Sequence, residues 1–598
     1  MKQPATPRFA PAHHDGSPLY VSTSAPSIGD GVELRVRVSR ELEVVAVHAR
    51  STPDGEPRFD LATPETAEAV ADEIWWRVRV PVVNPELSYR FVLQTPGGAL
   101  WLTAAGLSRT EVTDDTDFLI STAPPAPSWS DGAVVYEIFL DRFARSEAWE
   151  RPALPEWADE ASWTDRVPWG TERALQQVYG GDLHGVVERL DHLVALGVDV
   201  IYLTPFFPSR SNHRYDSTTF STVDPLLGGD DGLRRLTDAA HARGMRVIGD
   251  ITLNHSGDGH EWFRRALADP GSAERDFYFI DPDDESYASF CGVPTLPTFD
   301  HRSSELRARL YDGEESVIRR GVRDWGLDGW RVDVAQSAGR HGTVELNDLV
   351  ARRTRGSLDP GHLLLAENQF DASRALRGEG WHGTMSYAGF SRPVWSWLAR
   401  ERSHEFWGTP GPIPQYTAAD VRAVMTMYSS RIPWRSYSHN LTLIDSHDTA
   451  RFRSIAGADR QLLAAALMFA LPGIPMVFAG DEVGVEGVHL EDGRRPFPWD
   501  PEEWDPDAWS VYRELIALRR GHEALRTGGL RWLHASDDVL IFERASETGS
   551  VLVLVARDAH EPLTSPVDGA SLIDGDDLVA GAPIPGEGAR FGIWEVSR

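Results

Sequence analysis

Short apolar runs alternate with helical segments through the middle of the chain, and this alternation constrains the fold more than any other feature. The first run is AVVYEIF at residues 133–139 and the last is IPMVFAGDE at 474–482. About eight such strands over about 350 residues suit a closed (β/α)8 barrel with insertions. A doubly wound open sheet is the alternative, but no G-x-G-x-x-G turn follows the first run. We therefore expect an α/β protein built on a TIM barrel. The other runs are VDVIYLTP, MRVIGDITLNH, LDGWRVDV, HLLLAEN and LTLIDSHD.

Both flanks of the predicted barrel have the pattern of β domains. Segments such as VELRVRV (32–38) alternate polar and apolar residues, which predicts an N-terminal β-sandwich domain over residues 1–125. The stretch STAPPAPSWSDG (121–132) is rich in proline and serine and indicates a linker. The barrel domain is then predicted at 130–524. Hairpin patterns beyond it predict a C-terminal β-sandwich domain at 525–598.

Two local features refine the predicted barrel. The segment 256–312 follows the third apolar run and is too long for an ordinary loop, so we expect a small inserted domain there. The stretch DLHGVVERLDHLVALG (182–197) predicts a helix that ends at Gly197. Its expected buried stripe consists of Val186, Leu190, Leu193 and Val194.

The charge balance narrows the class of partner. The 598-residue chain has 59 basic and 90 acidic residues, for a formal net charge of −31. Such a surface repels nucleic acid and anionic lipid, so neither a nucleic-acid nor a membrane partner is expected. No apolar stretch is long enough to span a bilayer. The 21 tryptophans favour a carbohydrate ligand, because indole planes contact the apolar faces of sugars well.

The N-terminus and the cysteine content indicate the compartment. The first residues, MKQPATPRFAPAHHDG, lack the apolar core of a signal peptide, so a cytoplasmic location is expected. Cys291 is the only cysteine, which excludes an intramolecular disulfide and fits a reducing compartment. We expect this thiol to be buried and unreactive.

Charged and polar residues gather where the apolar runs end. In a barrel of parallel strands these ends form one face, where catalytic groups lie. Each residue alone has a structural explanation, such as a cap, a turn or a core histidine. Together they predict one polar site, made of Asp250, Asn254, His255, Arg331, Asp333, Glu367, Asp445, His447 and Asp448.

Two of these residues, Arg331 and Asp333, lie two positions apart in GWRVDVAQ. In a strand they share one face, while Trp330 and Val332 share the other. The pair could be a structural ion pair at a strand end. Alternatively, it could serve acetal hydrolysis, which needs one protonated carboxyl and one ionised carboxylate on either side of the scissile bond. An arginine beside the ionised member would keep it charged and oriented.

Several segments resemble those of a known family. GDITLNH, GWRVDVAQ, LLLAEN and LIDSHD are similar, in order and spacing, to the four signature segments of the α-amylase family of retaining glycoside hydrolases. YGGDLHGVVERLDHLVALGV, NHRYDSTTF and PGIPMVFAGDEVG resemble further family segments. The resemblance covers about residues 130–520 and joins seven stretches.

The resemblance implies specific roles for the strand-end residues. It implies Asp333 as the nucleophile, Glu367 as the general acid/base and Asp448 as the carboxylate that binds ring hydroxyls in the transition state. Arg331 would orient Asp333. The other implied substrate-binding residues are His255 and His447 for sugar hydroxyls, Tyr215 for stacking with His213 nearby, and Asp250 and Asn254 for the pocket floor.

The N-terminal stretch WWRVRVPVVNPELSYRFVL resembles the extra β-sandwich of the neopullulanase, cyclomaltodextrinase and maltodextrin glucosidase subgroup. That implies a homodimer formed through the N-terminal domain and intracellular action on short or cyclic α-glucans. Two positions depart from the subgroup. Gln336 stands where an asparagine is usual, and Phe370 follows Glu367 by three residues where an aromatic usually comes sooner.

No cofactor is expected, and no metal site is predicted. The segment DRFARSEAWERP lacks the asparagine and aspartates with which many relatives bind structural calcium. Two alternatives to hydrolysis stay open. One is a glucanotransferase or disaccharide isomerase on the same fold. The other is a non-catalytic binding module, although such proteins usually lose one of the three acids.

Overall fold

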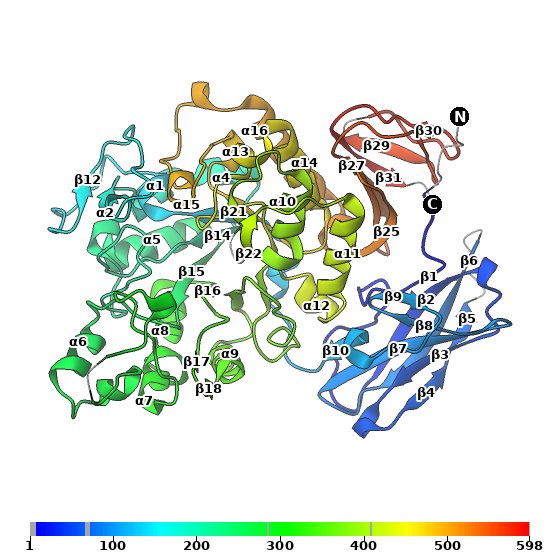
Figure 1. Ribbon diagram of the computed structural model, residues 1–598, viewed down its shortest axis with the longest axis horizontal. Helices are drawn as coiled ribbons and strands as arrows, with labels where there is room; N and C mark the ends of the chain where they lie inside the picture. The colour runs from blue at the N-terminus through cyan, green and yellow to red at the C-terminus, as the bar shows by residue number, and fades with distance from the viewer. Residues whose placement is uncertain (1–6, 66–71, 284–285, 407–408, 574, 597–598) are drawn as a thin grey trace.

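The computed structural model describes residues 7–65, 72–283, 286–406, 409–573 and 575–596 (Figure 1). In Figure 1 both groups of antiparallel strands lie on the same side of the barrel and its helices, the N-terminal one in blue below the C-terminal one in orange and red. The predicted fold class, a parallel barrel with an N-terminal and a C-terminal β domain, is confirmed. The exact domain boundaries remain predictions.

The barrel is a closed ring of eight parallel strands in chain order. Seven of them coincide with the predicted apolar runs. The sixth, β20, has only three residues, GTM, and its short, partly polar sequence gave no apolar signal. The strands are β11 (Val135–Ile138), β14 (Val200–Leu203), β15 (Arg246–Thr252), β16 (Gly329–Asp333), β19 (Leu363–Glu367), β20 (Gly383–Met385), β23 (Leu441–Thr442) and β24 (Ile474–Phe478).

Side-chain alternation divides the barrel interior into an apolar floor and a polar top. Inward residues near the strand starts, such as Val200, Ile248 and Leu363, pack into one apolar cluster. Inward residues nearer the strand ends are charged, for example Arg331 and Asp333. Trp330 and Val332 point to the other face and pack in the larger outer core with the helices, as the strand pattern predicted.

Helices cover the outside of the barrel. They include α3 (Leu183–Glu188), α4 (Leu190–Leu196), α5 (Gly229–His241), α8 (Val317–Trp325), α9 (Asn347–Gly356), α10 (Arg392–Leu398), α11 (Ala418–Ser429), α14 (Ala458–Ala470) and α16 (Pro506–Gly521).

The helix predicted over 182–197 is in fact two helices. The chain breaks at Arg189, where φ is −108° and ψ is 7°, between α3 and α4. Gly197 ends α4 with φ 94°, as predicted. Val186, Leu190 and Leu193 are buried, but Val194 is 50% exposed, so its place in the buried stripe was wrong. The buried face of α4 consists of Leu190, Leu193 and Leu196, and Val194 lies to one side of that face.

The N-terminal β region consists of two antiparallel sheets that enclose their own core. In β2 the buried residues are Val32, Leu34, Val36 and Val38, which matches the predicted alternation. One sheet contains β1 (Ala12–His13), β2 (Gly31–Ser39), β6 (Glu73–Pro81) and β5 (Thr63–Glu65). The other contains β4 (Arg58–Leu61), β3 (Ala46–Ser51), β7 (Glu86–Thr95), β8 (Gly98–Thr103), β9 (Gly106–Ser108) and β10 (Phe118–Ser121).

The C-terminal β region has a five-stranded antiparallel sheet and a two-stranded one. The predicted hairpin strands are the first three of the larger sheet. Its strands, in spatial order, are β25 (Gly529–Ala535), β26 (Val539–Ala545), β27 (Ser550–Ala556), β31 (Arg590–Val596) and β29 (Gly569–Ile573). The smaller sheet pairs β28 (Leu563–Thr564) with β30 (Pro583–Ile584).

The long segment after β15 contains α6 (Glu261–Ala268), α7 (Ser304–Arg307) and isolated bridges, among them His255 with Thr298. Cys291 lies in this segment in a Phe290–Gly292 turn with φ 51°. Its thiol is free and exposed, so the expectation of a buried cysteine was wrong. A surface turn on an excursion from the barrel offers no core in which the side chain could be buried.

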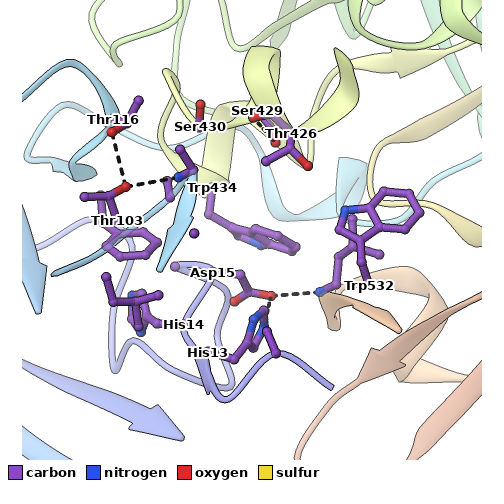
Figure 2. A pocket seen from close by; sticks show the side chains of 18 of the residues that line it. His13, His14, Asp15, Thr103, Thr116, Thr426, Ser429, Ser430, Trp434 and Trp532 are labelled. Atoms are coloured by element: carbon purple, nitrogen blue, oxygen red, sulfur yellow. Dashed lines mark hydrogen bonds and ion pairs between the residues drawn. The ribbon is translucent and has the colours of Figure 1, made fainter. Parts of the chain in front are cut away.

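A cavity of about 620 Å³ lies where the N-terminal sheets meet α11, α12 (Trp434–Tyr437) and β25 (Figure 2). Several of its polar groups hydrogen-bond within the protein. Asp15 accepts a 2.8 Å hydrogen bond from the Leu530 amide, and Thr116 donates to Thr103 over 3.2 Å. The strand-end carboxylates are not among its lining residues, so the candidate site lies elsewhere. Every helix in the described part of the chain is too short or too polar to cross a bilayer.

Candidate active site

Arg331 holds three carboxylates at the top of the barrel. Its Nη1 donates to Oδ1 of Asp333 over 2.8 Å and to both oxygens of Asp250 over 3.1 and 3.0 Å. Its Nη2 lies 3.2 Å from Oε2 of Glu367 in an ion-pair contact. The four side chains are inward residues of β15, β16 and β19, which are neighbours in the ring. The structure thus brings these four predicted site residues together.

Backbone conformation after β16 positions Glu367. Val334 has φ 43°, a left-handed conformation that is strained for a β-branched residue. Its amide donates to Oε2 of Glu367 over 2.8 Å, and the Ala335 amide donates to the Glu367 carbonyl over 3.0 Å. The Gln369 side chain donates to Oε1 over 3.1 Å. Glu367 is therefore fixed through both carboxylate oxygens.

A second group, on the other side of the barrel, surrounds His447. Its Nε2 lies 2.6 Å from the Tyr215 hydroxyl and 3.3 Å from Oδ2 of Asp448. The rings of Tyr215 and His447 stack, with centroids 5.6 Å apart and an interplanar angle of 8°. Nη2 of Arg494 lies 3.3 Å from Oδ1 of Asp448, and its Nε donates to the His447 carbonyl over 2.6 Å.

Asp250 links the two groups. Besides Arg331, it accepts hydrogen bonds from the Tyr202 hydroxyl over 2.6 Å and the Tyr215 hydroxyl over 2.9 Å. The carboxylate is completely buried. A buried charge requires such partners, and three of them hold this one as the floor between Asp333 and Tyr215.

Three of the four remaining predicted residues, His213, His255 and Asn254, lie beside these groups. The His213 ring stacks on Tyr215 at 5.8 Å, and the His255 ring stacks on Phe290 at 5.4 Å. Asn254 lies next to His255, with Nδ2 3.2 Å from Nδ1. Burial lowers the pKa of both His213 and His255 to about 4, so both rings are neutral near pH 7.

The carboxyl groups of Asp333 and Asp250, beside Arg331, titrate as coupled groups. Burial raises the pKa of Asp333 well above its ordinary value, and Arg331 opposes that shift, while Glu367, Asp250 and Asp448 reinforce it. Burial likewise raises the pKa of Asp250 against the opposing charge of Arg331. Mutual repulsion keeps such a cluster from losing its last proton easily. Burial and the neighbouring carboxylates thus favour the protonated form of Asp333, and the charge of Arg331 favours the ionised form.

Asp448 has the opposite environment. Burial disfavours its charge, but His447 and Arg494 outweigh burial and lower the pKa of Asp448. Burial would lower the pKa of His447, but the charges of Asp448 and Glu137 outweigh burial and raise it. The site therefore contains an ionised carboxylate next to a cationic ring.

Asp445, also at the end of an apolar run, lies outside this constellation. Its Oδ2 accepts a 2.6 Å hydrogen bond from the Phe452 amide. Through Asp481 it belongs to a buried network with Arg451, whose Nη1 lies 2.8 Å from Asp481. Its contacts are those of a structural residue.

Sequence reasoning missed Glu137, Tyr202, Gln369 and Arg494. Glu137 and Tyr202 are inward residues of predicted strands, so counting the alternation along each run could have found them. Gln369 comes two residues after a predicted acid. Arg494 lies in the irregular segment after α15 (Leu490–Gly493), where no periodic signal marks it. Within the described residues, no group of three or more His, Cys, Asp or Glu side chains is arranged to hold a metal ion.

The comparisons with known proteins agree with this geometry. The family model "Alpha amylase, catalytic domain" matches residues 137–355 and 408–511, more than half of the chain. Neopullulanase 2 of Thermoactinomyces vulgaris is 30% identical over 504 residues, which cover 81% of this chain and 80% of that protein. The chain belongs to the α-amylase family.

Other members resemble this α-amylase family hydrolase over nearly the whole length. A cyclomaltodextrinase of Bacillus sp is 28% identical over 558 residues, or 89% of this chain and 92% of that protein. A solved cyclomaltodextrinase structure superimposes with a TM-score of 0.72 at 26% identity, and covers 98% of this chain and 99% of that one. The similarity therefore extends beyond the catalytic barrel to both flanking β regions.

Proposed function

We propose that this glycoside hydrolase cleaves α-glucosidic bonds in short or cyclic α-glucans with retention of configuration, through a covalent glycosyl-enzyme intermediate. The observation that carries the proposal is the contact of one guanidinium, that of Arg331, with both Asp333 and Glu367. Two carboxylates on neighbouring nitrogens of one guanidinium lie close together. Retaining enzymes need such proximity, with carboxyl groups about 5 to 5.5 Å apart, whereas inverting enzymes leave room for a water.

Each acid has one step in the proposed reaction. Glu367 gives its proton to the glycosidic oxygen while Asp333 attacks the anomeric carbon as a carboxylate, which the charge of Arg331 favours against burial. Glu367 then takes a proton from a water molecule whose oxygen bonds to the anomeric carbon, and the bond between the sugar and Asp333 breaks. Asp448, held ionised by its cationic neighbours, accepts hydrogen bonds from ring hydroxyls as positive charge develops on the sugar.

The other groups bind and shape the substrate in this proposal. The Tyr215 ring stacks on the sugar at the cleavage subsite. The neutral ring of His255 has a buried Nε2 with no hydrogen-bond partner in the described part of the chain, and it suits a sugar hydroxyl. His213, His447 and Asn254 complete the polar wall. No cofactor takes part.

The proposal extends to the substrate class, the compartment and the oligomeric state. Relatives named neopullulanase and cyclomaltodextrinase support oligosaccharide or cyclic substrates. A single, free cysteine fits a reducing cytoplasm. We propose a homodimer formed through the N-terminal sheets.

Product analysis tests the reaction. The substrates are maltotriose, a cyclodextrin, pullulan, panose and a mixed-linkage cyclic tetrasaccharide. We expect no product with more glucose units than its substrate, and the first products should be the α-anomers. Products larger than the substrate would instead indicate a glucanotransferase, and release of the β-anomer would contradict retention.

Two variants test the assignment of the acids. Asp333→Asn and Glu367→Gln should fold normally and lose several orders of magnitude in rate, or about 5 kcal/mol in the barrier. A variant that keeps a tenth of the wild-type activity would remove its residue from the mechanism.

A further inference from the structure

Glu137, the last inward residue of β11, is completely buried behind His447. Its Oε1 contacts Nδ1 of His447 as an ion pair. Its Oε2 is buried and has no hydrogen-bond partner among the side chains and backbone that the structure describes. A buried carboxylate with one unpaired oxygen is costly for the fold. Such a cost at the edge of a substrate pocket points to a role in the chemistry.

The hydrogen bonds around His447 identify the protons on its ring. The Tyr215 hydroxyl has one proton, which it donates to Asp250. Its oxygen must then accept from Nε2 of His447, 2.6 Å away. An ionised Asp448, 3.3 Å from the same nitrogen, can only accept as well. Nε2 therefore carries a hydrogen. On the other side, an ionised Glu137 can only accept, so Nδ1 carries the second hydrogen.

The alternative is a neutral pair, in which Glu137 is protonated and donates to Nδ1. The surroundings favour the charged form. The Asp448 carboxylate faces the ring from the next residue along the chain, and Asp250 lies beyond Tyr215. Arg494 opposes the positive charge, but it contacts Asp448 and the His447 carbonyl and not the ring nitrogens. His213 is neutral near pH 7, since burial lowers its pKa to about 4.

We infer that Glu137 is a positioning residue that keeps His447 as an imidazolium with both N–H groups fixed, so that His447 orients Asp448 and Tyr215 toward the substrate. This inference rests on the roles proposed above for those two residues. Glu137 itself does not reach the sugar, because His447 lies between them. The raised pKa of His447, which the charges of Asp448 and Glu137 produce against burial, supports the same protonation state.

The inference predicts the direction in which the pH dependence of kcat/KM shifts when the charge of Glu137 is removed. A histidine with a raised pKa stays cationic at neutral pH and loses its proton as the pH rises through that pKa. The alkaline limb of kcat/KM, which reports the free enzyme, should therefore contain His447. Removing the charge of Glu137 should move this limb to lower pH.

Glu137→Gln keeps the size of the side chain and an oxygen that can accept from Nδ1, but it removes the charge. We expect the alkaline limb to move down by about one pH unit or more, as loss of an adjacent opposite charge does. Glu137→Asp keeps the charge at a longer distance, and its limb should lie between those of the wild type and Glu137→Gln. An unchanged limb in both variants, with only a lower melting temperature, would overturn the inference.

Glu482→Gln provides a matched control. Glu482 is another buried glutamate that contacts a histidine, with Oε1 2.9 Å from Nε2 of His192 and 2.7 Å from the Tyr136 hydroxyl. Tyr136 points to the outer face of β11, so this contact lies in the outer core and not in the substrate pocket. The control should lose stability and keep the wild-type pH profile.

Neutron diffraction of the wild-type protein near pD 7 tests the inference without any variant. We expect deuterium on both ring nitrogens of His447 and none on Glu137. Deuterium on Glu137 with one bare ring nitrogen would overturn it. If the wild type cleaved no α-glucan, the proposed function would fail while the neutron result still decided the protonation state. If it cleaved glucans and the limb did not move, only the inference would fail.

Discussion

Nη1 of Arg331 lies 2.8 Å from Oδ1 of Asp333, two residues along the same strand, and both side chains point into the barrel. The pair occupies the polar top of the barrel, where Arg331 also contacts Asp250 and Glu367. An ion pair that served only the fold would not need three carboxylates around one guanidinium. The arrangement fits a catalytic floor that holds Asp333 in a fixed orientation.

The first prediction concerns Arg331→Lys. Lysine keeps the charge but cannot contact Asp333, Asp250 and Glu367 with a planar fork of donors. We expect single-turnover rates to fall by at least a hundredfold. A variant that melts several degrees lower yet hydrolyses at the wild-type rate would mean that Arg331 serves stability alone.

The second prediction separates the two roles of Tyr215. Tyr215→Phe keeps the ring but removes the hydroxyl between Asp250 and His447. Hydrogen bonds to charged groups contribute about 1.5 to 3 kcal/mol, so kcat should fall about ten- to a hundredfold with little change in KM. Tyr215→Ala should raise KM as well, because the stacking surface is lost. Steady-state kinetics distinguish these patterns, and a wild-type kcat for Tyr215→Phe would remove the hydroxyl from the mechanism.

The third prediction concerns residues 1–125. Their removal should weaken dimerisation and shift preference toward larger glucans, while the barrel, which has its own core, still folds. The truncation removes ion pairs between the N-terminal region and the barrel, such as that of Arg377 with Glu86 over 2.6 Å. Some loss of stability is therefore expected. Sedimentation velocity at micromolar concentration is the measurement. Full-length protein that sediments as a monomer would refute the dimer.

The fourth prediction concerns acid stability and His260, the N-cap of α6. Its Nδ1 accepts a 3.1 Å hydrogen bond from the Trp262 amide, and burial lowers its pKa to about 3. Below the ordinary pKa of 6.5 the unfolded chain takes up a proton that the folded ring does not. Stability therefore falls as the pH drops from about 6.5 toward 3, by about 2 kcal/mol from this residue by pH 5.

His260→Asn keeps a capping oxygen and removes the titration. Urea unfolding at pH 7.5 and pH 5 should show a smaller difference between the two pH values for the variant than for the wild type. Equal differences would mean that His260 does not contribute to acid sensitivity.

Sequence patterns predicted the parts of this protein that depend on regular alternation. The period of two in GWRVDVAQ placed Arg331 and Asp333 on one face, and the barrel follows from the repeated runs. Sequence patterns failed for residues whose exposure or contacts depend on the tertiary structure around them. Val194 is exposed because the buried face of α4 runs through Leu190, Leu193 and Leu196. Cys291 is exposed because its turn lies on an excursion from the barrel. Arg494 reaches Asp448 from an irregular segment that only tertiary structure can place.

The central claim is that Asp333 forms a covalent bond with the sugar. Glu367→Gln incubated with α-maltosyl fluoride tests it directly, because fluoride leaves without a proton and the variant lacks the base that activates water. Mass spectrometry of the digested protein should find one maltosyl group on the peptide that contains Asp333. Fluoride release with no adduct, or an adduct on another residue, would contradict the claim.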